Sequence, residues 1–169
     1  GSGEDASDMV GIDDRGNVTV VGLSDHGVPV KNDPGVYRAD IYGRVRVRVY
    51  SANGTPSRLQ TLYRGERDGT LVGPYELASA VSRAGAGLVV WNGLPPGTKR
   101  DSDRAMLAAF RRPGAKRFAK PFVVPNSRGS DDATVAFTRG GDPLLAFVPR
   151  GRRRLSLLHL SSRGAVEQT

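Results

Sequence analysis

The side chains best placed for chemistry are two asparagines, each of which follows a candidate strand and stands before a glycine. The strand at 45–50 leads to Asn53, and the apolar run at 87–91 leads to Asn92. Sites in open α/β sheets form just beyond the carboxyl ends of the strands. We therefore expect both asparagines on loops at one rim of a sheet. An amide neither titrates near neutral pH nor attacks a carbonyl carbon, so the pair predicts a site without acid–base or nucleophilic catalysis.

A second candidate is His26, which stands in the sequence Ser-Asp-His-Gly. A histidine acts as a general base when a carboxylate or hydroxyl partner holds its ring. The simpler interpretation of His26 is a loop residue beside a turn glycine. His159 alternates with leucines and is assigned a structural role. The chain has no cysteine, which excludes disulfides, thiolate zinc sites and thiol nucleophiles, and two histidines alone argue against a metal centre.

Positive charge is concentrated in the later part of the chain. Residues 99–154 hold 14 Lys and Arg against 5 Asp and Glu, whereas the remainder holds 11 against 12. This asymmetry favours an anionic partner such as a polyphosphate, a nucleic acid or a membrane surface. A solvated basic face is the alternative explanation of the same charge.

The chain has the length of a single domain, and its apolar content is ordinary. It contains 169 residues, of which 38% are hydrophobic and 25% are charged. We assign the domain to residues 9–163, with a tag remnant and disordered linker at 1–8 and a loose tail at 164–169. No run approaches the roughly 18 apolar residues of a membrane span, and no signal peptide is visible. No membrane span is therefore expected.

The hydrophobic pattern predicts two helices on either side of a buried strand. The first helix is predicted to begin at Pro74, where a missing N–H costs nothing, and to stop at Gly85. The second is predicted to begin near Asp101 and to end before Pro113. Between them, the continuous apolar run at 87–91 is typical of a strand covered on both faces.

Antiparallel segments flank this predicted β–α–β–α–β core. Residues 9–21 have the pattern of a hairpin, and residues 134–160 have that of a β-meander. The Val/Arg alternation at 45–50 predicts a strand with one apolar and one basic face. No internal repeat is apparent. The predicted fold class is therefore α/β, with parallel neighbours joined by right-handed crossovers and a meander that could form a flap.

The order of these elements resembles that of a known family. It is similar to the caspase-like self-processing cysteine peptidase domain of MARTX-type toxins and of actinobacterial toxin-like proteins. The matching segments, in chain order, are residues 10–18, 49–54, 71–78, 89–93, 122–127 and 135–148. The resemblance implies a mainly parallel central sheet with flanking helices and a C-terminal antiparallel β-flap. Asn53 and Asn92 stand where the family has its catalytic His and Cys, so it also implies a degenerate, inactive peptidase.

The terminal flap of the toxin family binds inositol hexakisphosphate through Lys and Arg. Charge-assisted pairs between guanidinium and phosphate groups suit such a ligand. The arginines in the matching region are Arg128, Arg139, Arg150, Arg152, Arg153 and Arg154.

The expected function is a catalytically inactive, peptidase-like module of a larger secreted or toxin-like protein. Its expected partners are a polyanion such as inositol hexakisphosphate, bound on the basic flap, or neighbouring domains of the parent protein. The alternative is a toxin effector enzyme that acts on nucleic acid or a nucleotide through His26 and the basic C-terminal half.

Overall fold

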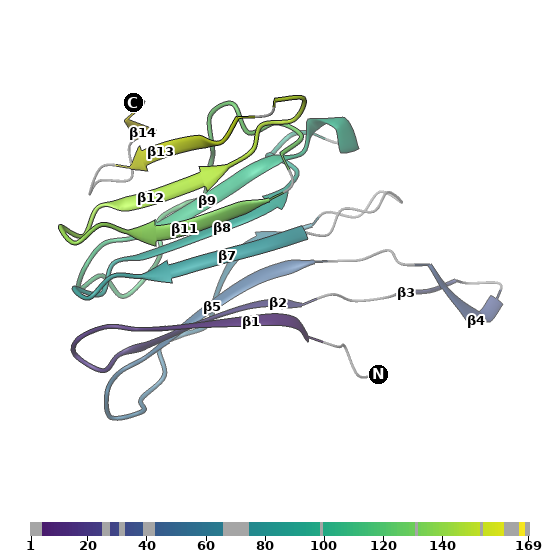
Figure 1. Cartoon of the computed structure of the whole chain (residues 1–169). Coiled ribbons are helices and arrows are strands. Elements are labelled where there is room, and N and C mark those ends of the chain that lie inside the picture. The colour runs from purple at the N-terminus through teal and green to yellow at the C-terminus, as the bar shows by residue number, and fades with distance from the viewer. Residues whose placement is uncertain are drawn as a thin grey trace.

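The computed structural model consists almost entirely of β-strands (Figure 1). It describes residues 5–24, 28–30, 33–38, 43–65, 75–98, 100–130, 132–152, 154–160 and 166–167. The strands of the first half are β1 (Asp5–Ile12), β2 (Val18–Ser24), β3 (Val28–Val30), β4 (Asp33–Arg38), β5 (Arg44–Tyr50) and β6 (Gln60–Arg64). Those of the second half are β7 (Tyr75–Val81), β8 (Gly87–Gly93), β9 (Ala105–Arg111), β10 (Phe122–Val123), β11 (Ala133–Phe137), β12 (Pro143–Phe147), β13 (Ser156–Leu160) and β14 (Val166–Glu167). A 3₁₀ turn, η1 (Asp101–Asp103), precedes β9.

The strands form three antiparallel sheets of four strands each. The first sheet has the order β1-β2-β5-β6, the middle sheet β7-β8-β9-β10 and the third sheet β11-β12-β13-β14. Every pairing recorded in these sheets is antiparallel and joins strands that follow one another, apart from the β3–β4 hairpin inserted between β2 and β5. Each sheet is therefore a meander built from local connections.

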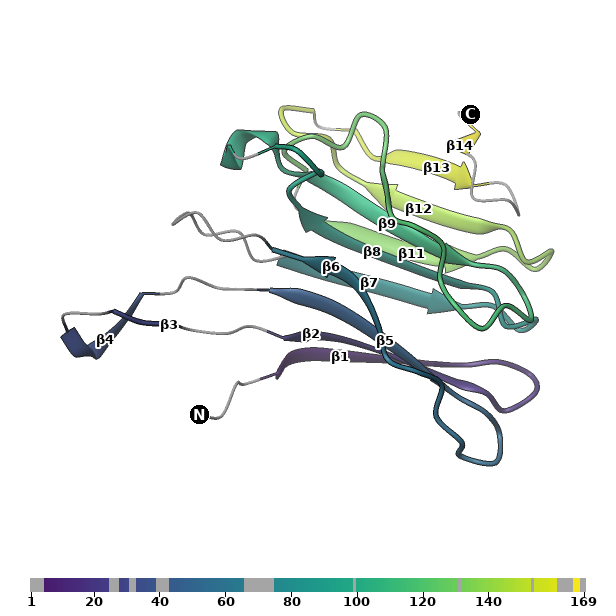
Figure 2. The same cartoon turned by 180° about the vertical axis from the view of Figure 1, so that it is seen from behind.

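The three sheets are stacked face to face, with the middle sheet between the other two (Figures 1 and 2). On one side, Val89 and Trp91 of β8 belong to a cluster with Val21 and Val45 of the first sheet. Because the middle sheet is covered on both faces, every residue of β8 and β9 is buried. The prediction of a strand covered on both faces at 87–91 is confirmed.

The other face of the middle sheet packs on the third sheet. Leu88 and Met106 lie in a cluster with Leu145, Phe147 and Leu160. Close approaches between different sheets involve the first strands: β1 and β2 approach β7, and β7 and β8 approach β11. The sheets therefore lie closest together along the edge formed by their first strands.

The first two strands of every sheet are joined by the same five-residue turn, at 13–17, 82–86 and 138–142. In each turn the first residue donates its N–H to the carbonyl of the fifth (3.1, 2.8 and 2.9 Å), and the fourth donates to the carbonyl of the first. The side-chain oxygen of the first residue, Asp13, Ser82 or Thr138, accepts the N–H of the fifth. The fourth residue is a glycine with φ of 77°, 86° or 89°. The chain is thus built from three structural repeats, each a four-stranded sheet, which the sequence pattern did not reveal.

The predicted α/β fold with a caspase-like parallel sheet and flanking helices is wrong. The segment expected to be the first helix forms β7, and the one expected to be the second forms β9. Both contain Ala and Leu, which favour helices in isolation, but pairing into the middle sheet and packing against the neighbouring sheets decide the outcome. Across the described ranges, no strand pair is parallel and η1 is the only helical element. The antiparallel meander predicted near the C-terminus is confirmed, although it is a third stacked sheet and not a flap.

Candidate anion-binding cleft

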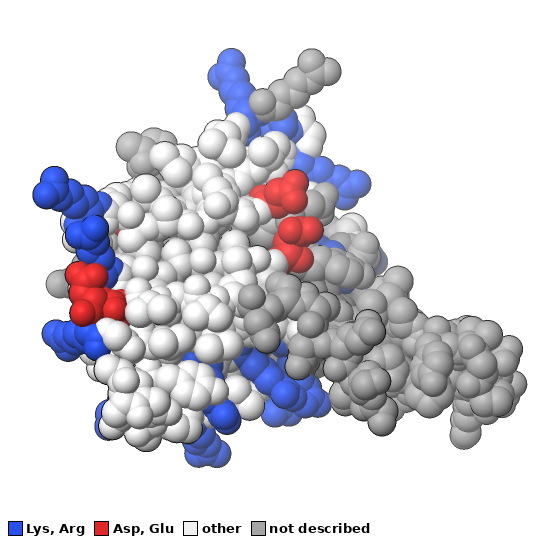
Figure 3. All heavy atoms as spheres, turned by 60° about the horizontal axis from the view of Figure 1, so that its bottom comes forward, with Lys and Arg blue, Asp and Glu red and all other residues white. Residues whose placement is uncertain are grey.

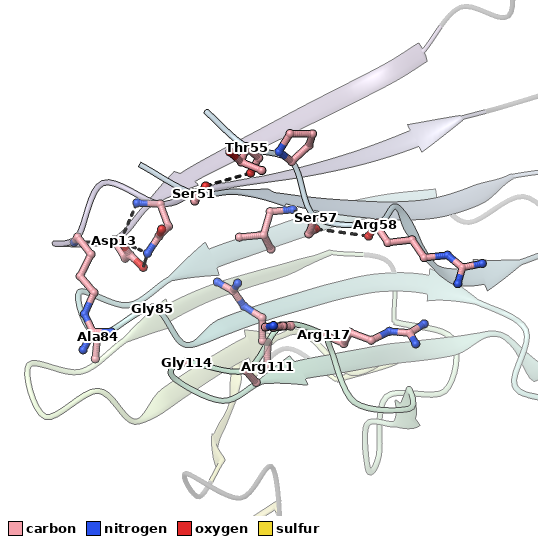
Figure 4. A pocket seen from close by; sticks show the side chains of 16 residues that line it. Asp13, Ser51, Thr55, Ser57, Arg58, Ala84, Gly85, Arg111, Gly114 and Arg117 are labelled. Atoms are coloured by element: carbon pink, nitrogen blue, oxygen red, sulfur yellow. Dashed lines mark hydrogen bonds between the residues drawn. The ribbon is translucent and has the colours of Figure 1, made fainter. Parts of the chain in front are cut away.

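A cleft of about 670 Å³ opens between the first and middle sheets, at the end of the stack that carries the 13–17 and 82–86 turns (Figure 4). We call it the basic cleft. Four connections and the ends of β5 and β9 line it, and the charged residues among them are Asp13, Arg15, Arg58, Arg111, Lys116 and Arg117. The cleft therefore combines five cationic side chains with a single carboxylate.

The Asp13 carboxylate fixes the turn that carries Arg15. Its Oδ1 accepts the backbone N–H of Arg15 (3.0 Å) and of Asn17 (2.9 Å), and the Asn17 amide donates to Oδ2 (2.9 Å). The N–H of Asp14 donates to the carbonyl of Arg83 (2.9 Å), which connects this turn to the turn of the middle sheet. Both sheets therefore hold this wall of the cleft in place.

The ionisation of Asp13 follows from the same contacts. Burial would raise the pKa of the carboxyl, but hydrogen bonds from Asn17 and Arg15 and the charge of Arg111 outweigh that effect. The pKa of Asp13 therefore lies below its ordinary value. Asp13 is therefore ionised at neutral pH, where it stabilises the wall and offsets part of the positive charge of the cleft.

Arg111 ends β9 and is only 5% exposed. Its Nη2 donates to Thr19 Oγ1 of the first sheet (3.1 Å), and its guanidinium carbon lies 5.6 Å from the centre of the Phe118 ring. Its Nε is buried and has no hydrogen-bond partner. Burial lowers the pKa of Arg111 and the charge of Asp13 partly restores it, yet an arginine stays protonated at neutral pH.

The opposite wall of the cleft is held by a side chain of β6. The amide of Gln60 pairs with the backbone of Phe118, donating from Nε2 to its carbonyl (2.9 Å) and accepting its N–H at Oε1 (3.0 Å). This two-bond contact attaches the β9–β10 connection to the first sheet. It therefore positions Lys116 and Arg117, which immediately precede Phe118.

Asn53 and Asn92, which were expected at one rim of a sheet, do not share a site. Asn53 lies in the exposed turn after β5, where its Oδ1 accepts Ser51 Oγ (2.6 Å) and Thr55 N (3.0 Å). Asn92 is buried near the far end of β8, where its Nδ2 donates to the carbonyl of Ser130 (2.5 Å). Because β5 ends beside the 13–17 turn and β8 begins at the 82–86 turn, the asparagines lie at opposite ends of the stack.

The arginines expected to bind an anion are divided between two places. Arg150, Arg152 and Arg154 lie in the β12–β13 connection, and the Arg150 side chain lies against Gly129, beside Arg128. Arg139 lies in the 138–142 turn, at the other end of β12. The exposed Arg128 forms an ion pair with the partly buried Asp103, at 3.8 Å. Arg153 and the alternative catalytic residue His26 lie outside the described residues.

Sequence reasoning missed the residues that the fold does bring together. Arg15 and Arg58 are far from Arg111 in the sequence, and Arg111 lies at the end of a segment predicted to be helical. The available signal was the repeated turn with its oxygen-bearing first residue and fourth-position glycine. Aligning the turns would have placed the first two sheets side by side, with Arg15 and residues 82–86 at the same end.

Comparison of the sequence with models of known protein families gave no match, and comparison with curated proteins gave no relative. In the described part of the chain, no group of three or more His, Cys, Asp or Glu side chains could hold a metal ion. Nor does any described helix have the length and apolar character that a membrane crossing requires.

Proposed function

We propose that this chain is a binding module whose basic cleft takes up a ligand that carries phosphate groups. The observation that carries the proposal is Arg111, a buried guanidinium with an unpartnered Nε in a cleft that holds four further cations and one carboxylate. A buried polar group without a partner calls for an explanation, and an anion bound nearby would lower the cost of the buried charge. Guanidinium groups suit phosphate because they donate parallel hydrogen bonds.

The size of the cleft indicates a small ligand. Its volume of about 670 Å³ lies within the range of small-molecule sites. Arg58 and Arg117 are exposed on opposite walls, so they can contact the outer oxygens of a ligand without loss of buried packing. Pyrophosphate and inositol hexakisphosphate are suitable probes, because they differ in size but carry the same chemical groups.

The proposal is tested by calorimetric titration of both probes into the purified chain at low and moderate salt. We expect binding that weakens with salt, since screening reduces the attraction between exposed charges. Arg58→Gln combined with Arg117→Gln should weaken binding about tenfold or more, a loss of roughly 1.4 kcal/mol. The matched control combines Arg152→Gln with Arg154→Gln, which removes the same charge from the distant β12–β13 connection and should leave the affinity nearly unchanged.

Two results would overturn the proposal. Equal weakening by the two double variants would mean that the ligand responds only to net charge. Loss of binding in the control alone would place the anion on the arginines of the β12–β13 connection. An accompanying thermal-shift measurement checks that each variant is folded, and the wild type should gain stability with ligand by mass action.

A further inference from the structure

The three sheets are related head to tail, so that equivalent residues face the same way along the stack. The three sheets can be aligned on the fourth-position glycines of their turns, Gly16, Gly85 and Gly141. The residues that follow these glycines by five positions are then equivalent, and they are Val21 of β2, Val90 of β8 and Ala146 of β12. Val21 packs toward the middle sheet, and Val90 packs toward the third sheet. By the same alternation Ala146, together with its neighbour Leu144, faces outward from the third sheet. We call this surface the leading face.

The opposite surface of each sheet follows the same rule. Val89 of β8 packs back on the first sheet, and Leu145 of β12 packs back on the middle sheet. Their equivalent in β2 is Val20, which faces outward from the first sheet. We call this outer surface of the first sheet the trailing face. Both ends of the stack therefore carry residues of the kind that is buried between sheets elsewhere in the chain.

The first strands fit together by size. Gly11 of β1 leaves room for Val81 of β7, because a Cβ atom at Gly11 would lie 2.5 Å from Val81 Cγ2. The equivalent pair between the middle and third sheets is Ala80 and Phe137, again a small residue facing a larger one. Ala136 on the leading face is equivalent to Gly11 and Ala80, and Ile12 on the trailing face is equivalent to Val81 and Phe137. If a leading face met a trailing face, Ala136 would therefore lie opposite Ile12. Each of these two side chains is exposed in the single chain.

Both end surfaces expose large apolar side chains, and the trailing face also carries the arginines of β5. Val10 and Ile12 on the trailing face are each 63% exposed, and Leu157 on the leading side of β13 is 53% exposed. Figure 3, in which the bottom of the stack comes forward, shows an uncharged area with Lys, Arg, Asp and Glu around it. Repeat arrays normally end in units with a polar outer face, and a contiguous exposed apolar patch marks an interaction surface.

We propose that the leading face of one chain packs on the trailing face of a second copy, and that the return contact closes the pair into a ring of six sheets. The occupant is a second copy because each face continues an interface that already exists within the chain, and one chain carries both faces. Convergence of the sheets at their first strands makes the stack turn about an axis. Four-stranded sheets arranged around an axis are the blades of β-propellers, which typically have four to eight blades.

The arginines on the outer face of β5 lie within the trailing face, because β5 is an inner strand of the first sheet and Arg48 pairs with Val20 of β2. Arg44, Arg46 and Arg48 share one face of the strand, opposite the buried Val45 and Val47. Their aliphatic stems can extend the apolar surface while the guanidinium groups reach the rim of the interface. The ring does not depend on the basic cleft, because the cleft lies between two sheets of the same chain.

The proposal is tested by sedimentation equilibrium and light scattering over a wide range of concentration. The wild type should have twice the mass of one chain. Ile12→Glu and Ala136→Arg should each give monomers with unchanged circular dichroism, because both positions are exposed in the single chain. Mixing the two variants should restore the dimer, since one interface is then wild type and the other pairs Glu with Arg. Val123→Glu places the same charge on an exposed valine of β10, away from both faces, and should leave the dimer intact.

A wild-type chain that stays monomeric at every concentration would overturn the proposal. So would an open polymer that grows with concentration, because head-to-tail contacts that fail to close produce filaments instead of a ring. Failure of the mixed variants to pair would show that Ile12 and Ala136 do not meet across the interface.

Discussion

Gly85 is the residue at which the turns of the first two sheets meet. Its φ of +86° is a conformation that favours glycine, and a Cβ atom there would lie 2.7 Å from Asp13 Oδ2. Gly54 has nearly the same φ, +83°, but nothing within 4 Å of such a Cβ. The two glycines therefore separate the cost of backbone strain from the cost of a collision between sheets.

We expect Gly54→Ala to lower the free energy of unfolding by about 1 kcal/mol, because only the backbone conformation is strained. Gly85→Ala should cost clearly more, since it also displaces the Asp13 carboxylate and its hydrogen bonds. Urea unfolding of both variants and the wild type provides the measurement. Equal losses for the two substitutions would contradict the contact between the two turns.

The lowered pKa of Asp13 predicts a particular loss of stability in acid. A carboxyl with a depressed folded-state pKa stabilises the protein above its unfolded-state value of about 3.9, and this contribution disappears as the pH falls through the folded-state pKa. Stability should therefore decrease below about pH 4. Asp13→Asn should flatten this part of the profile, whereas the same change at the exposed Asp14 serves as the control. A profile that Asp13→Asn leaves unchanged would contradict the assignment. Thermal unfolding from pH 2 to 7 measures the stability of the wild type and of both variants.

At the level of elements, β8 contributes to both interfaces between sheets, with one face toward the first sheet and the other toward the third. Val89 packs toward the first sheet and Val90 toward the third, and each is 1% exposed. We expect Val89→Ala and Val90→Ala each to destabilise the fold by about 1–4 kcal/mol, because both leave a cavity in a packed core. Val123→Ala, at a position 45% exposed, should cost much less. Chemical denaturation measures these losses. In a half-exposed strand, only one of the two substitutions at adjacent residues would destabilise the fold.

The strands that the sequence predicted correctly are those whose composition agrees with their environment. Leu88 to Trp91 is apolar and rich in β-branched and aromatic residues, and the Val/Arg alternation of β5 matches its buried and solvent-facing sides. The segment that forms β7 was predicted to be a helix because Leu77, Ala80 and Val81 also satisfy a helical spacing, and the segment that forms β9 because Met106, Leu107 and Phe110 were expected on one buried helical face. In a strand buried on both faces, such as β9, apolar and polar residues no longer alternate. The period of the hydrophobic pattern then cannot distinguish a strand from a helix.

The candidate site was less predictable than the strands. Its side chains come from four connections and two strand ends, and only the stacking of two sheets brings them together. The turns that would have revealed this stacking share a geometry but not a first residue, since Asp13, Ser82 and Thr138 fill the same role. They also occur at unequal intervals along the chain, which conceals the repeat from a search for a fixed period.

At the scale of the whole molecule, the basic excess of the later chain does not form a single surface. Arg111, Lys116 and Arg117 line the cleft beside the first sheet, whereas Arg150 and its neighbours lie at the other end of the stack. Charge counted along the sequence therefore indicates an anionic partner without locating it. The double variants of the cleft and of the β12–β13 connection separate the two locations.

The β3–β4 hairpin shows how such a molecule can acquire new parts. It interrupts the connection between the second and third strands of its sheet and lies apart from the stack (Figures 1 and 2), yet β2 and β5 remain paired from Val18–Tyr50 to Ser24–Arg44. The corresponding connection of the middle sheet carries η1. This position therefore tolerates inserted sequence, because the register of the sheet is set by the strands and not by the length of the chain between them. A protein engineer could graft a peptide or a small domain at this connection, and natural selection could have used the same freedom to vary what one end of the stack presents.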